Sequence, residues 1–203
     1  MFWHLRQLFL NLFIIYEKHI LNYSGGVFKG VFKGVHFQNE KCDCIKYLKL
    51  VDPCCGSGSF LVRAMTQALD DCATATEQEN VKKHQIFGIE FDENIYGLAT
   101  TNMLIHSDGN SNIKQGSCFN LADWIKEAKP NIILMNPPYN GQRIHLPKKY
   151  VATWTKNKKE DPSKGLYFVK YIADTLNSIN HQAKLAVYFL SPVLSEQAEK
   201  LLA

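Results

Sequence analysis

Short apolar runs alternate with segments whose apolar residues recur at helical spacing along most of this 203-residue chain. The apolar runs lie near residues 47–51, 86–90, 112–115, 131–136 and 185–190. The helical segments lie near residues 3–22, 59–72, 92–106, 120–128, 165–179 and 194–202. Continuous apolar runs are typical of strands buried on both faces. The alternation therefore predicts an α/β fold with a doubly wound, mostly parallel sheet in the strand order 3-2-1-4-5.

The run at 131–136 leads into the sequence Asn-Pro-Pro-Tyr at 136–139. Two consecutive prolines cannot extend a strand, so a rigid turn is expected at its carboxyl end, the edge where open α/β sheets bind ligands. The amide side chain and backbone carbonyls of this turn can accept N–H hydrogens from a flat base, and Tyr139 can stack on its face. Taken alone, the tetrapeptide could also be an ordinary loop.

A glycine turn follows the strand at 47–51. Gly56 and Gly58 remove Cβ atoms where a ligand must approach the backbone, and the following helix offers free N–H groups to an anion. The strand at 86–90 ends at Glu90, a carboxylate that can accept hydrogen bonds from both ribose hydroxyls. The polar stretch at 70–84 is predicted as a long connection. This interpretation requires the glycine turn and the amide at 136 to open into one cleft.

The glycine turn, the acidic strand end and the Asn-Pro-Pro-Tyr turn, in this order, resemble the N6-adenine DNA methyltransferases. The closest resemblance is to the modification subunit of type I restriction–modification systems, and it covers residues 46–195. It implies a Rossmann-like fold that uses S-adenosylmethionine to methylate the N6 amine of adenine in double-stranded DNA, after the base has left the stack. It also implies a specificity subunit and a restriction subunit as partners.

The resemblance assigns roles to residues of this chain. The implied catalytic residues are Asn136, Pro137, Pro138 and Tyr139. The implied cofactor-binding residues are Asp52, Pro53, Cys54, Gly56, Ser57, Gly58, Phe60, Glu90, Phe91, Ser117, Cys118 and Phe119. Phe119 could also be a plain core residue. No metal, nucleophile or general-base histidine is required, because positioning and electrostatics carry a direct displacement.

The chain departs from the family pattern at several places. Family members usually carry an acidic residue after Gly116; here it is Ser117, whose hydroxyl has no charge, so weaker cofactor binding is expected. A tandem Gly-Val-Phe-Lys repeat at 25–37 replaces the family's upstream Phe-Thr-Pro-like element. The family's sheet has two further strands, so an edge beyond 185–190 is expected to be open or covered by a partner. We therefore expect an N-terminal segment at 1–45 and a truncated catalytic core at 46–203.

Basic residues gather after the Asn-Pro-Pro-Tyr turn. The chain's net charge is +4, and residues 143–164 carry seven basic residues against two acidic ones. The candidate nucleic-acid contacts are Arg143, Lys148, Lys149, Lys156, Lys158 and Lys159. An arm of this kind positions the phosphate backbone of DNA but reads little sequence. A solvated polar loop is the alternative interpretation.

The chain has six cysteines and no recognisable secretory signal, which predicts reduced thiols in the cytoplasm. A zinc site at Cys42, Cys44, Cys54 and Cys55 is a minor alternative, because the spacing differs from that of the usual paired ligands. The apolar stretch near residues 2–23 is too short and too interrupted for a membrane helix, so no membrane association is expected.

Three functions remain open at this stage. The first is adenine-N6 methylation of DNA within a restriction–modification system. The second is methylation of RNA guanine-N2, since such enzymes show a similar glycine turn and the same catalytic turn. The third is a non-catalytic remnant that binds a partner subunit.

Overall fold

The computed structural model describes residues 12–16, 48–106, 112–152, 154, 157, 159–178 and 184–189. The repeat at 25–37, the predicted helix near 194–202, and Cys42, Cys44, Lys156 and Lys158 lie outside these residues.

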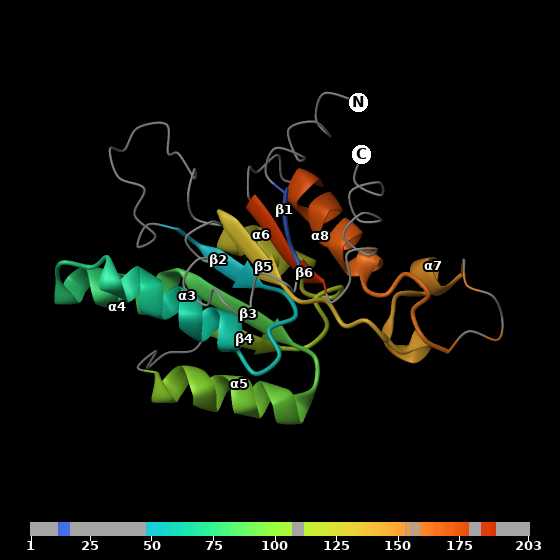
Figure 1. Ribbon diagram of the computed structural model, residues 1–203, viewed down its shortest axis with the longest axis horizontal. Helices are drawn as coiled ribbons and strands as arrows, with labels where there is room; N and C mark the ends of the chain where they lie inside the picture. The colour runs from blue at the N-terminus through green and yellow to red at the C-terminus, as the bar shows by residue number, and fades with distance from the viewer. Residues whose placement is uncertain are drawn as a thin grey trace.

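Parallel strands form a single sheet across the described residues, in the order β1-β6-β5-β2-β3-β4 (Figure 1). The strands are β1 (Leu12–Tyr16), β2 (Leu50–Asp52), β3 (Ile86–Glu90), β4 (Asn112–Gln115), β5 (Ile132–Met135) and β6 (Lys184–Phe189). Every neighbouring pair is parallel. The order of β2 to β6 is the predicted order, so the doubly wound fold is confirmed.

Helices cover both faces of the sheet (Figure 1). They are α3 (Ser59–Asp70), α4 (Ala75–His84), α5 (Glu93–Ile105), α6 (Ala122–Ala128), α7 (Lys148–Val151) and α8 (Leu166–Ser178), with a short 3-10 helix, η3 (Arg143–His145). β5 alternates between the two layers: Ile132 and Leu134 pack with α3 and α5, whereas Ile133 and Met135 pack with α6 and α8. A strand buried on both sides explains the continuous apolar run.

The predicted helix near 3–22 is wrong at Leu12–Tyr16, which forms β1. This strand pairs in parallel with β6, from Leu12 opposite Leu185 to Tyr16 opposite Phe189. The edge expected to be open or covered by a partner is therefore occupied by the chain itself. A run of aromatic and β-branched residues suits a buried strand as well as a buried helix, and only the pairing decides between them.

The predicted connection at 70–84 contains α4 instead. Thr74 begins this helix with a capping box: its hydroxyl accepts the Glu77 N–H at 3.2 Å, and the Glu77 carboxylate accepts the Thr74 N–H in return. Val81 is the buried residue of α4, so the helix lacks the apolar stripe that would have indicated it.

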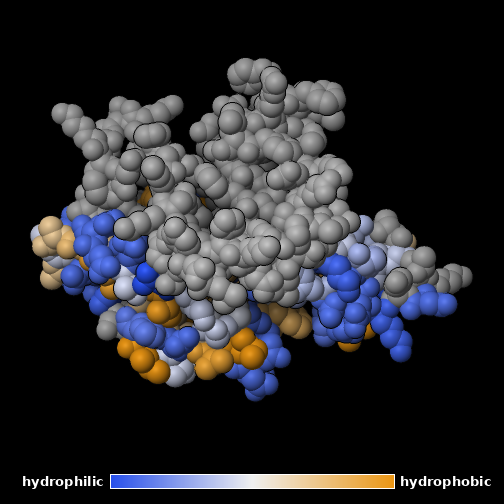
Figure 2. Space-filling view, viewed as in Figure 1, coloured by the Kyte–Doolittle hydropathy of each residue, from blue (hydrophilic) through white to orange (hydrophobic). Residues whose placement is uncertain are grey.

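Two further features concern the helices. α5 carries exposed apolar side chains, Leu98, Leu104 and Ile105 among them. Orange, apolar surface lies low in the view, where Figure 1 places α5 (Figure 2). Within the described residues, no helix combines the length and apolarity needed to cross a bilayer.

Gly88 allows β3 and α3 to pack closely. A Cβ at this position would lie 2.6 Å from Cδ1 of the buried Leu61 and 3.2 Å from Sγ of Cys55. We expect Gly88→Ala to lower the free energy of unfolding by about 1–3 kcal/mol through overpacking. Urea denaturation measures this change.

Gly97→Ala is the matched control, because a Cβ on Gly97 in α5 meets nothing within 4 Å. Alanine in a helix interior should stabilise this site by about 0.5–1 kcal/mol. Equal stability of the two variants would contradict the close packing at Gly88.

Candidate functional site

A cavity of about 340 Å³ opens where β2, β3, β4 and β5 end. Its lining residues are Pro53, Cys54, Gly56, Glu90, Phe91, Ile95, Gly116, Ser117, Cys118, Phe119, Asn136, Pro138, Gly141, His145, Leu146 and Phe168. The glycine turn after β2 and the amide of Asn136 after β5 therefore open into one space, as the sequence interpretation required.

The glycine turn is held by both β3 and α5. Gly56 has a left-handed φ of 56°, and its N–H donates to Oε2 of Glu90 at 2.8 Å. A Cβ on Gly56 would meet nothing within 4 Å, so this backbone faces open space. The Asn102 side chain of α5 donates to the Ser57 carbonyl at 3.0 Å. These bonds fix a turn whose backbone a ligand can approach closely.

Glu90 is oriented by backbone donors on both carboxylate oxygens. Oε2 accepts the Gly56 N–H and Oε1 accepts the Asp92 N–H, each at 2.8 Å. A carboxylate offers about four lone-pair sites, so each oxygen can accept one further hydrogen bond. The side chain is thus preorganised at the cavity wall with acceptor capacity to spare.

Asp52 lies behind the cavity wall and does not line it. Its side chain is buried, and Oδ1 accepts the Cys54 N–H at 3.0 Å. Burial raises the pKa of Asp52 to about 7; the Cys54 N–H opposes this rise and the charge of Glu90 adds to it. Asp52 therefore supports the turn from behind the cavity wall, and its contact with a cofactor stays a prediction.

The Cys54 thiol beside the cavity keeps its proton. Cys54 and Cys118 both line the cavity, and hydrogen bonding to the Cys118 thiol, together with burial, raises the pKa of Cys54 well above its usual value. Burial also raises the pKa of Cys55, which packs beneath Gly88. Protonated thiols are weak nucleophiles. Of the four cysteines in the zinc alternative, Cys54 and Cys55 lie in the described part of the chain, and Cys42 and Cys44 do not.

The Asn-Pro-Pro-Tyr turn starts directly after β5. Asn136 is exposed and, with Pro138, lines the cavity, whereas Pro137 is buried. The Tyr139 hydroxyl donates to Oδ1 of Asn136 at 3.0 Å. The Tyr139 ring packs against the core and does not line the cavity, so its stacking role stays a prediction.

Aromatic rings wall one side of the cavity. Phe119 lies 4.8 Å from both Phe168 and Tyr171 between ring centroids, and the Tyr171 hydroxyl donates to the Phe119 carbonyl at 3.0 Å. Phe91 contacts His145 at 5.0 Å between centroids. Phe119 both lines the cavity and packs against the core, and its contact with a cofactor stays a prediction.

The site residues named from the sequence omit part of the cavity lining and include residues that do not line the cavity. The missed lining residues are Ile95, Gly116, Gly141, His145, Leu146 and Phe168. The named residues that do not line the cavity are Asp52, Ser57, Gly58, Phe60, Pro137 and Tyr139. Gly116 follows β4 directly, so its place at the same sheet edge was a usable signal; the others reach the cavity from helices and from the segment after the turn.

The basic segment is partly folded back on the protein. Arg143 donates from Nη2 to the Val151 carbonyl at 3.2 Å and lies 5.7 Å from the ring centre of Trp154, which is itself buried. Lys148 and Lys149 in α7 are exposed, and so is Lys159. Lys149 Nζ lies 4.8 Å from the ring centre of Tyr150. Lys148, Lys149 and Lys159 can therefore reach an external anion.

Comparisons with known proteins agree with this arrangement. The model of the family described as N-6 DNA Methylase matches residues 40–201. The chain is 37% identical over 102 residues to the type II restriction enzyme and methyltransferase RM.BcgI of Heyndrickxia coagulans, and 33% identical over 95 residues to the type I restriction enzyme EcoEI methylase subunit of Escherichia coli. These matches cover 48% and 45% of this chain but only 16% and 19% of the two relatives.

A solved structure of the type I R-M system superposes with a TM-score of 0.51 at 19% identity, covering 63% of this chain and 25% of the other. At that identity the superposition supports the fold alone.

The raised pKa of Asp52 predicts a pH-dependent stability. The folded chain keeps a proton on Asp52 that the unfolded chain releases between about pH 4 and pH 7, so the stabilisation is complete below pH 4 and is lost as the pH rises through 7. Asp52→Asn keeps an acceptor for the Cys54 N–H but cannot ionise. We expect the variant to be more stable than the wild type at pH 8, by on the order of a few kcal/mol, and to lose the fall between pH 5 and 8. Urea denaturation at both pH values measures this; identical pH profiles would contradict it.

Proposed function

The chain belongs to the N-6 DNA methylase family, and on this premise we propose that it transfers a methyl group from S-adenosylmethionine to the N6 amine of adenine in DNA, as the modification component of a restriction–modification system. The observation that carries the proposal is the single cavity that joins Gly56 and Glu90 to Asn136. A cofactor on one side and a base on the other can meet there without a barrier of packed side chains.

The residues on the β2–β4 side fit S-adenosylmethionine. A volume of about 340 Å³ lies within the range of small-molecule sites. Gly56 leaves backbone open to the ligand, Glu90 can accept hydrogen bonds from ribose hydroxyls, and Phe91 and Phe119 offer apolar faces for its adenine. Ser117 is a weaker partner than a carboxylate, because its Oγ already accepts the Phe119 N–H at 3.3 Å.

The Asn-Pro-Pro-Tyr turn would prepare the amine. Bound S-adenosylmethionine supplies an electrophilic methyl group. Oδ1 of Asn136 and the Pro137 carbonyl would accept hydrogen bonds from the two amine N–H groups and favour a geometry in which the nitrogen lone pair is available. The Tyr139 hydroxyl orients the amide without exhausting its oxygen, which has two lone pairs. Because its raised pKa keeps the Cys54 thiol protonated, this thiol competes poorly for the methyl group.

DNA and partner subunits belong to the same proposal. Lys148, Lys149 and Lys159 would contact phosphates beside the base pocket. The chain spans under a fifth of the length of the two relatives it matches. A specificity subunit, which would recognise the DNA sequence, and a restriction subunit would be further polypeptides of the assembly. We place this assembly in the cytoplasm, and we divide the chain into the segment 1–45 and the catalytic core 46–203.

Asn136→Ala tests the chemistry. Loss of the amide acceptor should lower methyl transfer to DNA at least about 100-fold, the scale seen when one stabilising hydrogen bond is removed from a catalytic site. The exposed side chain should be removed without loss of fold, and the dissociation constant of S-adenosylmethionine should stay unchanged in calorimetry. The readout is N6-methyladenine by mass spectrometry of nucleosides from unmethylated DNA, with the specificity subunit present.

Asn94→Ala, at an exposed position in the first turn of α5, is the control and should retain full transfer. Full activity in Asn136→Ala would remove the proposed role of the turn. Methylated guanosine in place of N6-methyladenine would favour the RNA-type alternative, and no cofactor binding by the wild type would favour the non-catalytic remnant.

The phosphate role of α7 predicts a change in salt dependence. Replacing Lys148 and Lys149 by Gln should lower the steepness of log K against log salt by about 0.9 for each phosphate that is no longer neutralised. Fluorescence anisotropy with a DNA duplex measures the slope. The pair Lys82→Gln and Lys83→Gln in α4, at the opposite end of the molecule in Figure 1, removes the same charge and should leave the slope unchanged. If the two double variants gave the same salt slope, the lysines of α7 would not contact phosphates, and their segment would be a solvated polar loop.

A further inference from the structure

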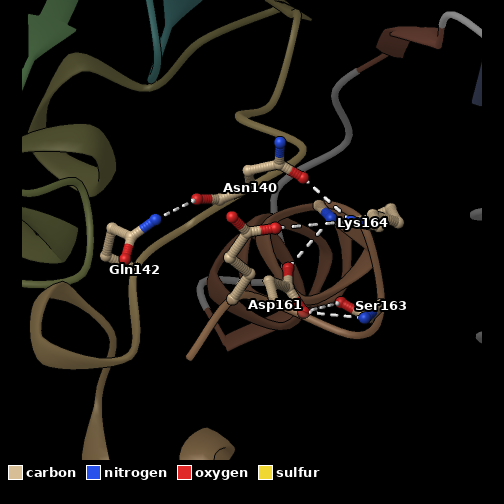
Figure 3. Close-up of polar contacts among 7 residues, drawn as sticks. Asn140, Gln142, Asp161, Ser163 and Lys164 are labelled. Carbon is tan, nitrogen blue, oxygen red and sulfur yellow. Dashed lines mark hydrogen bonds and ion pairs between the residues drawn. The ribbon is translucent and has the colours of Figure 1, made fainter. Parts of the chain in front are cut away.

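Asp161 is a buried carboxylate bonded to the segment that leads into α8. Oδ1 accepts both the N–H of Ser163 at 2.8 Å and its hydroxyl at 2.7 Å (Figure 3). Oδ2 accepts the Gly165 N–H at 2.9 Å, and the whole side chain is buried. Hydrogen bonds to a carboxylate are stronger than those between neutral groups. The loop from 161 to 165 is therefore tightly organised around one side chain.

Gly165 packs directly against the Asn-Pro-Pro-Tyr turn. Its φ of 95° lies in the region that favours glycine. A Cβ there would lie 3.1 Å from Cβ and 3.2 Å from Cγ of Pro137, and 3.3 Å from the Pro138 carbonyl oxygen. The position of the Gly165 backbone thus limits where both prolines can sit.

The same loop also holds the chain that follows the turn. The Asp161 N–H donates to the Gly141 carbonyl at 2.9 Å, and Lys164 Nζ donates to Oδ1 of Asn140 at 2.8 Å (Figure 3). The Arg143 N–H donates to the Lys159 carbonyl at 2.9 Å. The turn at 136–139 is consequently enclosed by β5 before it, by the bonded segment after it and by Gly165 against its prolines.

We propose that Asp161 and Gly165 are positioning residues for the methyl transfer: the Asp161 carboxylate fixes the Gly165 backbone against Pro137 and Pro138, and this contact sets the positions of the Asn136 amide and the Pro137 carbonyl. This inference rests on the proposed function. Asn136 is exposed, and the Tyr139 hydroxyl that its amide oxygen accepts belongs to the same turn, so this bond does not anchor the turn to the rest of the protein. The buried prolyl contact supplies the constraint that a base acceptor requires, because an error of about 1 Å in such a group costs about 100-fold in rate.

Gly165→Ala is the principal test, with Gly97→Ala as the matched control, since a Cβ on Gly97 meets nothing within 4 Å. We expect Gly165→Ala to lower the rate of methyl transfer at saturating cofactor about 100-fold while the dissociation constant of S-adenosylmethionine changes less than about threefold. Gly97→Ala should stay within about twofold of the wild type. A purely structural role would lower the melting temperature without separating rate from cofactor affinity.

Asp161→Asn is the second variant, and it tests the positioning role if Gly165→Ala melts below the assay temperature. Asparagine keeps one acceptor oxygen but turns the other into a donor, so the bonds to Ser163 and Gly165 cannot all persist. An intermediate fall in transfer rate, of about 10-fold, is expected. Transfer within about twofold of the wild type in a folded Gly165→Ala or Asp161→Asn variant would overturn the proposal.

Backbone hydrogen exchange separates this inference from the proposed function. Peptides covering 136–142 should exchange faster in Gly165→Ala and Asp161→Asn than in Gly97→Ala, because the turn is no longer packed against its partner. If the wild type transfers no methyl group, the proposed function fails, and the exchange alone decides whether the loop positions the turn. Unchanged exchange at 136–142 would overturn the positioning role whatever the activity.

Discussion

The cavity depends on the parallel pairing of β5, β2, β3 and β4 in adjacent positions. Parallel strands end at a common edge, so residues that are far apart in the chain are brought together wherever neighbouring strands stop. β2 lies between β3 and β5, and this places the glycine turn between Glu90 and Asn136. An exchange of strand order would separate these groups even if every local turn were kept.

Two neighbouring carboxylates have different roles because their environments differ. Asp52 is buried, and burial holds its pKa near 7, whereas Glu90 receives two backbone N–H bonds at the cavity wall. The charge of Glu90 adds to the rise in the pKa of Asp52, so a proton on Asp52 limits the repulsion between the two groups. The glycine turn is thus supported from below by the buried Asp52 and bound from the side by Glu90.

The base side of the cavity is built by a different principle. The acceptors of the Asn-Pro-Pro-Tyr turn lie on a segment that begins with the exposed Asn136, and rigidity comes from the two prolines and from the backbone of Gly165 packed against them. Asp161 organises that backbone through bonds to N–H and O–H groups. Residues about 25 positions further along the chain therefore determine how firmly the turn is held.

The amino-acid sequence by itself determined the strands β2 to β6 and the two turns that meet at the cavity, because periodicity and glycine or proline turns act over a few residues; the order of these strands followed from the connection rule of doubly wound sheets. It did not separate strand from helix at Leu12–Tyr16, where the apolar run suits both, and it did not indicate α4, whose stability comes from a capping box instead of an apolar face. His145, Leu146 and Phe168 reach the cavity only because the segment after the turn folds back across the sheet edge. The placement of Tyr139 against the core and of Gly165 against Pro137 was likewise decided only by tertiary structure, since packing between distant segments leaves no local pattern in the chain.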